Sequence, residues 1–309
     1  MKKAAVYPLV SPSITLDHLE RCLWSIECQG KVPFEFEVGI IVNSLNDPYT
    51  ASVKEKFGSD YEVFTTESNG RAGKGHNGKL DTFRSLYKER GYTHLIPIDG
   101  DDYLYPTAFE CIYRLHKKSG FDYLSGISPI GVDSLRPSPP PDKRPYVQVA
   151  EGLYIWTMER VRLGVSEYEY WNGDTCPGAE PILCLSAKAL ALENFRYTDE
   201  IGLAADYPFL CRGIASYLKE EMEFVTTDCN DIYVYDCTKD DSASRRKVSD
   251  LDPVKGWPFD KDGLLEKEIQ KEEFHILKGI TRLDLPYATL PQQMNNSEKI
   301  DWVIQGGMI

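Results

Sequence analysis

The sequence predicts an α/β protein in which helices flank a mixed, mainly parallel β-sheet. Two observations support this prediction. In the first half of the chain, short apolar runs alternate with amphipathic stretches of helix length. In addition, 309 residues with 42% hydrophobic side chains can bury the large core that such a sheet needs. We expect one domain over residues 1–250, with halves at 1–130 and 147–250, and a helical extension over 251–309.

The expected strands are short runs rich in apolar, β-branched and aromatic residues. In chain order they are Ala4–Val10, Phe36–Val42, Tyr61–Thr65, Thr93–Ile98, Tyr123–Ile130, Ile182–Leu185, Glu223–Thr226 and Ile232–Tyr235. The expected helices show apolar residues at helical spacing or recognisable start and stop residues. They are Leu16–Cys28, Asp47–Phe57, Lys79–Arg90, Ala108–Lys118, Ala187–Leu192, Asp206–Leu218 and Leu264–Leu277.

Glycine and proline mark where regular structure should stop. Gly91 and Gly120 directly follow two of the expected helices and suit helix ends. The glycine-rich stretch 70–78 predicts a flexible loop. The stretch 134–145 contains five prolines and cannot be regular, so it is the best candidate for a linker or lid.

Charge and composition exclude several classes of protein. The formal net charge of −13 leaves no generally basic surface for nucleic acid. No apolar run approaches the roughly 18 residues of a membrane span, and Ala4–Val10 is too short for a convincing signal peptide. The eight cysteines form no C-x-x-C pair, which argues against zinc ribbons, and we expect them to be reduced. These features predict a cytoplasmic protein without a membrane span.

The sharpest chemical feature is an apolar strand that ends in three carboxylates, Asp99, Asp101 and Asp102. In an open parallel sheet, ligands gather at the carboxyl ends of strands. A hard cation such as Mg²⁺ or Mn²⁺ would hold these acids together and bridge them to a diphosphate. Taken alone, the pattern is equally compatible with a solvated turn rich in Asp and Gly.

Three segments in order add a family resemblance. Asp99-Gly100-Asp101-Asp102-Tyr103-Leu104-Tyr105-Pro106-Thr107-Ala108 resembles the D-x-D-D-x-x-x-P-x-A signature of family 2 glycosyltransferases with the GT-A fold. Upstream, residues 69–78 resemble the family's glycine-rich segment before a helix. Downstream, 195–200 with 205–212 is similar to the segment that carries the catalytic base. The resemblance spans roughly residues 3–246.

The resemblance implies a metal-dependent, inverting glycosyltransferase with a nucleotide-sugar donor, most simply a UDP-sugar. Asp101 would hold Mn²⁺ or Mg²⁺, which neutralises the leaving diphosphate, and Asp99 would contact either this metal or the nucleotide ribose. Asp206 would be the general base that takes the proton of the acceptor hydroxyl. Taken alone, Asp206 would more simply be an N-terminal helix cap. The family also implies that residues 1–130 bind the nucleotide-sugar and 147–250 the acceptor.

The expected donor contacts lie at strand ends and in the glycine-rich segment. They are Pro8, Ser11, Asn43, Arg71, Lys74, Asn77, Lys79, Asp99, Gly100 and Asp101. Asn43 stands in a stretch that departs from the family's usual paired aspartates, which leaves the nucleotide open. Alternatively, residues 70–78 form an ordinary mobile connection, and His76 is structural.

The expected acceptor contacts come from a stretch that mixes aromatic, polar and glycine residues. They are Trp171, Asn172, Asp174 and Glu180, and a packed loop around one buried tryptophan is an equally good interpretation. The basic cluster Arg245–Lys247 would bind phosphate or simply be solvated. The acceptor is expected to be a carbohydrate or another hydroxyl compound.

Two alternative functions stay open. One is transfer to hydroxymethylated bases of viral DNA, which the net charge disfavours and the basic cluster at 245–247 keeps open. The other is a catalytically inactive GT-A module that binds a nucleotide-sugar or glycan. The C-terminal helix at 264–277 would pack across the acceptor side or mediate a homodimer.

Overall fold

The computed structural model describes the first 126 residues almost completely and shorter stretches after them. The described residues are 1–45, 47–126, 130–132, 146–150, 153–156, 181–193, 195–197, 199, 206, 209, 212–213, 216–217, 220–227 and 232–236. The predicted lid at 134–145, the predicted acceptor residues at 171–180 and the extension at 251–309 lie outside them. The domain boundaries therefore stay predictions.

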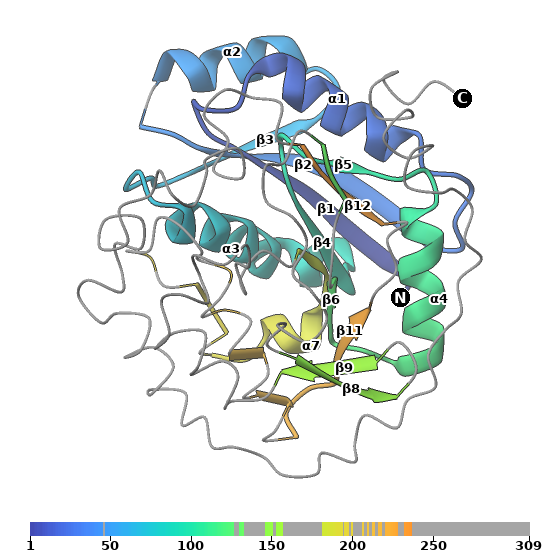
Figure 1. The fold of residues 1–309 in the computed structure, drawn as a ribbon. Helices are drawn as coiled ribbons and strands as arrows, with labels where there is room; N and C mark the ends of the chain where they lie inside the picture. The colour runs from blue at the N-terminus through green and yellow to red at the C-terminus, as the bar shows by residue number, and fades with distance from the viewer. Residues whose placement is uncertain are drawn as a thin grey trace, which may run out of the picture.

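A seven-stranded sheet forms the centre of the fold (Figure 1). Its strands are β1 (Lys3–Val10), β2 (Glu35–Asn43), β3 (Glu62–Thr66), β4 (His94–Asp99), β6 (Tyr123–Gly126), β10 (Ile182–Ser186) and β11 (Phe224–Thr227). They lie in the order β11-β6-β10-β4-β1-β2-β3. Strand β10 runs antiparallel to both of its neighbours, and every other pair is parallel. The predicted mixed, mainly parallel sheet is confirmed.

Helices cover both faces of this sheet. They are α1 (Leu16–Glu27), α2 (Asp47–Phe57), α3 (Ala72–Arg90), α4 (Ala108–Ser119) and the single turn α7 (Ala187–Leu190). Figure 1 shows α1 and α2 on one side of β1–β3 and α3 on the other. Apolar residues of α1 and α2, such as Leu19, Leu23 and Val53, pack with Val10 and Ile40 of the sheet. The predicted ends of α3 and α4 are confirmed, since the glycine after each helix has a positive φ.

Two smaller sheets were not predicted. One consists of β5 (Tyr103–Leu104), β12 (Tyr233–Asp236) and β7 (Ile130–Val132), and the other pairs β8 (Tyr146–Ala150) with β9 (Leu153–Trp156). The prediction of a single strand over Tyr123–Ile130 was wrong, because its two ends belong to different sheets. The strand at 232–235 joins β5 beside the acidic turn and not the main sheet.

The prediction of a flexible loop over 70–78 was wrong as well. Helix α3 begins at Ala72, so most of the glycine-rich segment forms its first two turns. These glycines let the helix lie close to the sheet: a Cβ on Gly75 would stand 2.5 Å from Asn43 Nδ2, and one on Gly78 would stand 2.2 Å from Thr66 Cγ2. The glycines therefore provide close helix–sheet packing in place of flexibility.

Two further predictions concern cysteines and membranes. Cys22, Cys28, Cys111 and Cys184 form no disulfide bond. Within the described stretches, no helix combines the length and the apolar character needed to cross a membrane.

Candidate active site

The acidic turn lies at the carboxyl end of β4, in the middle of the sheet. Asp99 is the last residue of that strand and pairs with Leu9 of β1. The next residue must be glycine, because a Cβ on Gly100 would stand 2.4 Å from Val10 Cγ1. The Gly100 N–H donates to the Leu9 carbonyl at 2.8 Å, which fixes the turn against β1. The chain therefore presents its carboxylates at the strand end where parallel sheets bind ligands.

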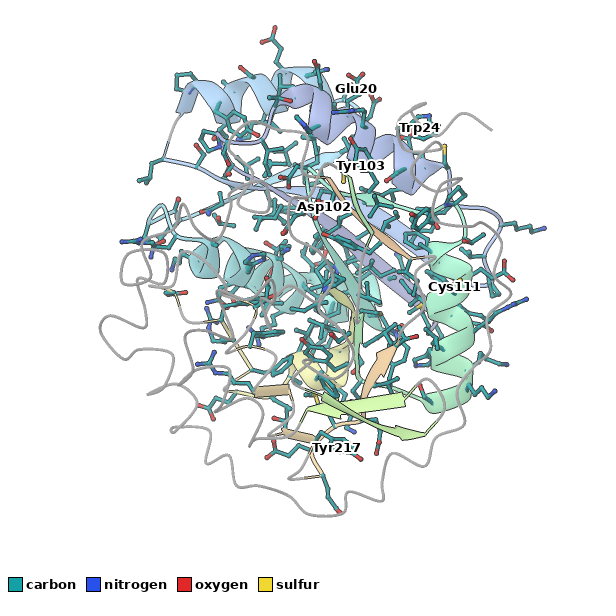
Figure 2. All side chains as sticks on the ribbon, in the orientation of Figure 1. Glu20, Trp24, Asp102, Tyr103, Cys111 and Tyr217 are labelled. Atoms are coloured by element: carbon teal, nitrogen blue, oxygen red, sulfur yellow. The ribbon has the colours of Figure 1, made fainter. Side chains whose placement is uncertain are left out.

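The three carboxylates of this turn do not point the same way. Asp102 is 2% exposed and accepts a hydrogen bond of 2.5 Å from the hydroxyl of Tyr233 in β12. Figure 2 shows it in the interior of the fold, close to Tyr103. Asp101 is half-buried, and the Asp99 side chain is 38% exposed. Asp99 and Asp101 are thus accessible, whereas Asp102 supports the turn from inside.

Helix α3 brings a buried cation to Asp99. Lys79 is 3% exposed and its Nζ lies 3.1 Å from Asp99 Oδ1. One turn earlier, His76 Nδ1 lies 4.0 Å from the same oxygen. This Nδ1 is buried and has no hydrogen-bond partner among the described residues. Burial lowers the pKa of His76, and the nearby Lys79 lowers it further, while Asp99 and Asp206 raise it.

A second carboxylate, from a distant part of the chain, interacts electrostatically with the same two side chains. Asp206 lies in helical backbone and is half-buried. Burial raises its pKa, His76 and Lys79 lower it, and Asp99 raises it. A hydrogen bond from Tyr197 also lowers the pKa. A carboxylate made more basic by burial and held by a donor is suited to accept a proton.

Asn43 occupies the carboxyl end of β2, two strands from Asp99. It is 8% exposed, and its Nδ2 lies 3.5 Å from the Arg71 carbonyl at the start of α3. Its Oδ1 is buried and has no hydrogen-bond partner among the described residues. An unsatisfied buried acceptor costs stability, so this amide oxygen is a natural contact for a ligand N–H.

The other residues that were predicted to contact the nucleotide-sugar differ in their surroundings. Pro8 is buried within β1 opposite Ile98, and Ser11 follows the strand with its hydroxyl 2.9 Å from that of Ser13. Arg71 is exposed at the N-cap of α3. Lys74 Nζ lies 3.6 Å from Asp199 Oδ2. These contacts to a donor stay predictions.

Asn77 joins α3 to the segment that precedes Asp206. Its side chain is 1% exposed and forms two bonds of 2.9 Å with the backbone of Tyr197, one to the carbonyl and one from the N–H. Its Nδ2 also donates to Asp199 at 2.6 Å. Asn77 was predicted to contact the nucleotide-sugar, but its side chain forms hydrogen bonds within the protein. Tyr197 and Tyr233 were not predicted to belong to the site, and His76 was expected to be structural.

Among the described residues, no three His, Cys, Asp or Glu side chains are grouped as a ready-made metal site. A magnesium or manganese ion needs only one or two protein carboxylates when substrate phosphates complete its shell. The accessible Asp99 and Asp101 fit that requirement. The buried Asp102 does not, since its carboxylate binds Tyr233.

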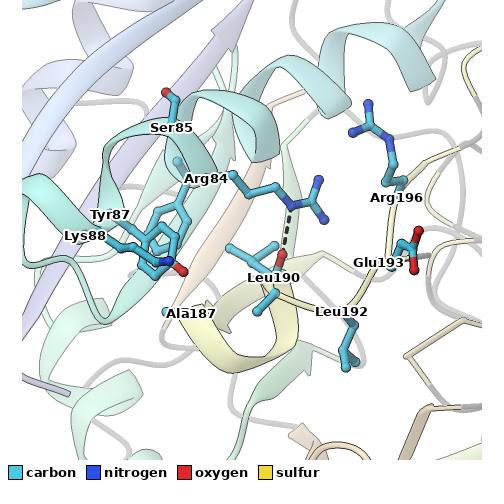
Figure 3. A pocket seen from close by; sticks show the side chains of 11 residues that line it. Arg84, Ser85, Tyr87, Lys88, Ala187, Leu190, Leu192, Glu193 and Arg196 are labelled. Carbon is cyan, nitrogen blue, oxygen red and sulfur yellow. Dashed lines mark hydrogen bonds between the residues drawn. The ribbon is translucent and has the colours of Figure 1, made fainter.

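A cavity of about 550 Å³ lies elsewhere, between the second half of α3 and α7 (Figure 3). Because Ser186, just before α7, pairs with His94, this cavity is at the amino end of β4, opposite Asp99. The Arg84 side chain at its wall donates to the carbonyls of Leu190 and Phe195. Arg196 is paired with Asp81. The cavity is therefore separate from the acidic turn.

Comparisons with known proteins show the fold. No protein-family model matches the chain, and no curated protein matches it. Among solved structures, S. aureus TarS 1–349 in complex with UDP has a TM-score of 0.55 at 17% identity, over 89% of this chain and 66% of that one. The same fragment in complex with UDP-GlcNAc has a TM-score of 0.52 at 16% identity, over 80% and 61%.

This chain thus spans just under two thirds of the length of those two solved chains. Together with the sheet order and the flanking helices, the likeness shows that the chain has a GT-A, nucleotide-diphospho-sugar transferase-like fold. The predicted fold class is confirmed.

Proposed function

We propose that the protein is a metal-dependent, inverting glycosyltransferase that moves a sugar from a UDP-sugar to an acceptor hydroxyl. One observation carries the proposal: Asp99 at the end of β4 and the distant Asp206 both interact electrostatically with His76 and Lys79 of α3. This arrangement supports a single site in which Asp99 helps to bind the donor and Asp206 accepts a proton. The fold supports the proposal, because TarS was solved with UDP and with UDP-GlcNAc.

In this proposal Asp206 is the general base. Its carboxylate accepts the proton of the acceptor hydroxyl while that oxygen forms a bond to the anomeric carbon. The bond from the anomeric carbon to the diphosphate breaks, and its electron pair leaves with UDP. Attack from the side opposite the leaving group inverts the anomeric carbon. Burial raises the pKa of Asp206 and so makes it a stronger base, while His76 and Lys79 limit that rise.

Asp99 and Asp101 are the proposed ligands of Mn²⁺ or Mg²⁺, which when bound would neutralise charge on the diphosphate. Lys79 already contacts Asp99 and adds a fixed positive charge on the donor side. Asn43 Oδ1, which has no hydrogen-bond partner in the part of the chain that the structure describes, is the proposed acceptor for the imide N–H of uracil. Ser11, Arg71, Lys74 and Gly100 remain proposed donor contacts, as do Trp171, Asn172, Asp174 and Glu180 for the acceptor.

Donor hydrolysis tests this proposal without knowledge of the acceptor. The protein is incubated with UDP-GlcNAc, UDP-glucose, UDP-galactose and a GDP-sugar, with Mn²⁺, Mg²⁺ or EDTA, and released nucleotide is measured. We expect slow, metal-dependent release of UDP from one UDP-sugar. Supplying an acceptor to that donor should raise the rate.

The variant Asp206→Asn should lower this accelerated rate by about 10²- to 10⁴-fold, the usual contribution of a general base. Donor binding should stay intact, because Asp206 acts on the acceptor. Glu89→Gln, an exposed carboxylate at the far end of α3, is the matched control and should leave the rate unchanged. Full activity of Asp206→Asn would contradict the proposal. Tight nucleotide-sugar binding without turnover would instead support an inactive binding module.

A further inference from the structure

Tyr197 is a neighbour of the proposed base Asp206 and has no role in the proposed reaction. It is 6% exposed and lies between α3 and the helical segment that carries Asp206. Asn77 binds both its backbone N–H and its carbonyl at 2.9 Å. Because Asn77 is itself 1% exposed on α3, the backbone of Tyr197 is fixed relative to that helix.

The ring of Tyr197 stacks on two other rings. It stacks on His76, with centroids 4.7 Å apart and planes 19° apart. It also stacks on Phe209, with centroids 4.1 Å apart and planes 3° apart. Stacking on two rings leaves the phenol little freedom to rotate or tilt. The direction of its hydroxyl is therefore determined by packing.

The Tyr197 hydroxyl forms a hydrogen bond with the Asp206 side chain. Phe209 also lies in helical backbone, three residues after Asp206. Asp206 thus provides the carboxylate that the phenol binds, and Phe209 provides a ring that holds the phenol. His76 completes the arrangement from α3, where it also lies beside Asp99.

We propose that Tyr197 is a positioning residue that orients the carboxylate of Asp206 toward the acceptor hydroxyl, with His76 and Phe209 holding its ring. This inference rests on the proposed function, since it assigns a partner to the proposed base. A carboxylate that accepts a fixed O–H donor keeps one oxygen occupied and presents the other. Precise placement of a reacting group is a large part of enzymatic rate acceleration.

The hydrogen bond also sets the pH range of the base. It favours the ionised carboxylate and so lowers the pKa of Asp206, against burial, which raises it. Among the described residues, the other charged or titratable groups that act on Asp206 are His76 and Lys79 from α3 and Asp99 from β4. Removing the hydroxyl leaves those groups in place and removes a single contribution that lowers the pKa.

The experiment compares Tyr197→Phe with the wild type. This substitution keeps the stacked ring and removes the hydroxyl. We expect kcat for sugar transfer to fall about tenfold, the value of roughly one lost hydrogen bond to a charged group, with the donor KM unchanged. The acid limb of the kcat profile against pH should move to higher pH. Tyr87→Phe, the same chemical change at the far end of α3, is the control and should alter neither quantity.

A second variant, Phe209→Met, keeps the hydroxyl and removes one stacking face, and kcat should again fall without a change in the donor KM. An unchanged kcat and pH profile in folded Tyr197→Phe, beside an inactive Asp206→Asn, would overturn the positioning role alone. Full activity of Asp206→Asn would overturn the proposed base together with its partner. The unfolding midpoint of each variant, measured in urea, verifies that the native fold is kept.

Discussion

Gly78 offers a stringent test of how α3 is placed, because an alanine there has two opposed effects. In an open helical position, Gly→Ala stabilises a protein by about 0.5–1 kcal/mol through helix propensity and chain entropy. In α3, however, the new Cβ would stand 2.2 Å from Thr66 Cγ2 and 2.9 Å from Thr66 Cβ. Carbon atoms in contact are about 3.5–4.0 Å apart, so the helix or β3 must move by more than 1 Å.

Overpacking of this kind costs about 1–3 kcal/mol, which exceeds the gain in propensity. We therefore expect Gly78→Ala to lower the free energy of unfolding in urea by about 1–2 kcal/mol net. The movement of α3 should also lower kcat, since His76 and Lys79 belong to this helix.

The double variant Gly78→Ala with Thr66→Ser separates the clash from other effects. Serine lacks the Cγ2 that clashes and retains the hydroxyl that donates to the Val42 carbonyl at 3.4 Å. About half or more of the lost stability should return, which a double-mutant cycle measures. A Gly78→Ala protein that is more stable than the wild type would refute the close packing of α3 against β3.

Two further predictions concern buried polar groups. Tyr233→Phe removes the hydroxyl that donates to the buried Asp102, so the free energy of unfolding should fall by about 1–3 kcal/mol, and an unchanged urea midpoint would contradict this bond. Burial, followed by the neighbouring His116, lowers the pKa of His94 to about 3. The ordinary pKa of histidine is about 6.5, so between pH 6.5 and pH 3 the unfolded state binds more protons than the folded state. Stability should therefore fall as the pH drops from 6.5 towards 3, by at most about 1.4 kcal/mol per pH unit from this residue. The difference between wild type and His94→Gln in urea titrations from pH 7 to 4 isolates that slope, and parallel curves would exclude it.

The order and type of the elements up to residue 126 were largely predictable from local pattern. Apolar runs and helix stop signals act over a few residues, so β1, β2, β4, α1 and α4 were recognised within one or two residues of their ends. The acidic turn after β4 was predicted for the same reason. Its place at the carboxyl edge of the sheet follows from the parallel register of β1 and β4.

The candidate site was predicted only where a motif is continuous in sequence. Asp206 was singled out by family resemblance, while Tyr197 and Tyr233 carry no local signal that separates them from core tyrosines. Their hydroxyls have a role only because distant carboxylates, Asp206 and Asp102, lie beside them in the fold. Likewise, nothing in the spacing of His76 indicates that it lies between Asp99 and a stacked tyrosine.

The sequence by itself determined the strand and helix rhythm, the acidic turn and the fold class, since each depends on neighbours along the chain. Only the tertiary structure decided that Gly73, Gly75 and Gly78 belong to the start of a helix, because Gly75 and Gly78 lie close to Asn43 and Thr66 on other strands. It also decided which carboxylates are accessible, since Asp102 turns inward to Tyr233 while Asp99 meets Lys79. Such contacts join residues 20 to more than 100 positions apart, and packing alone brings them together.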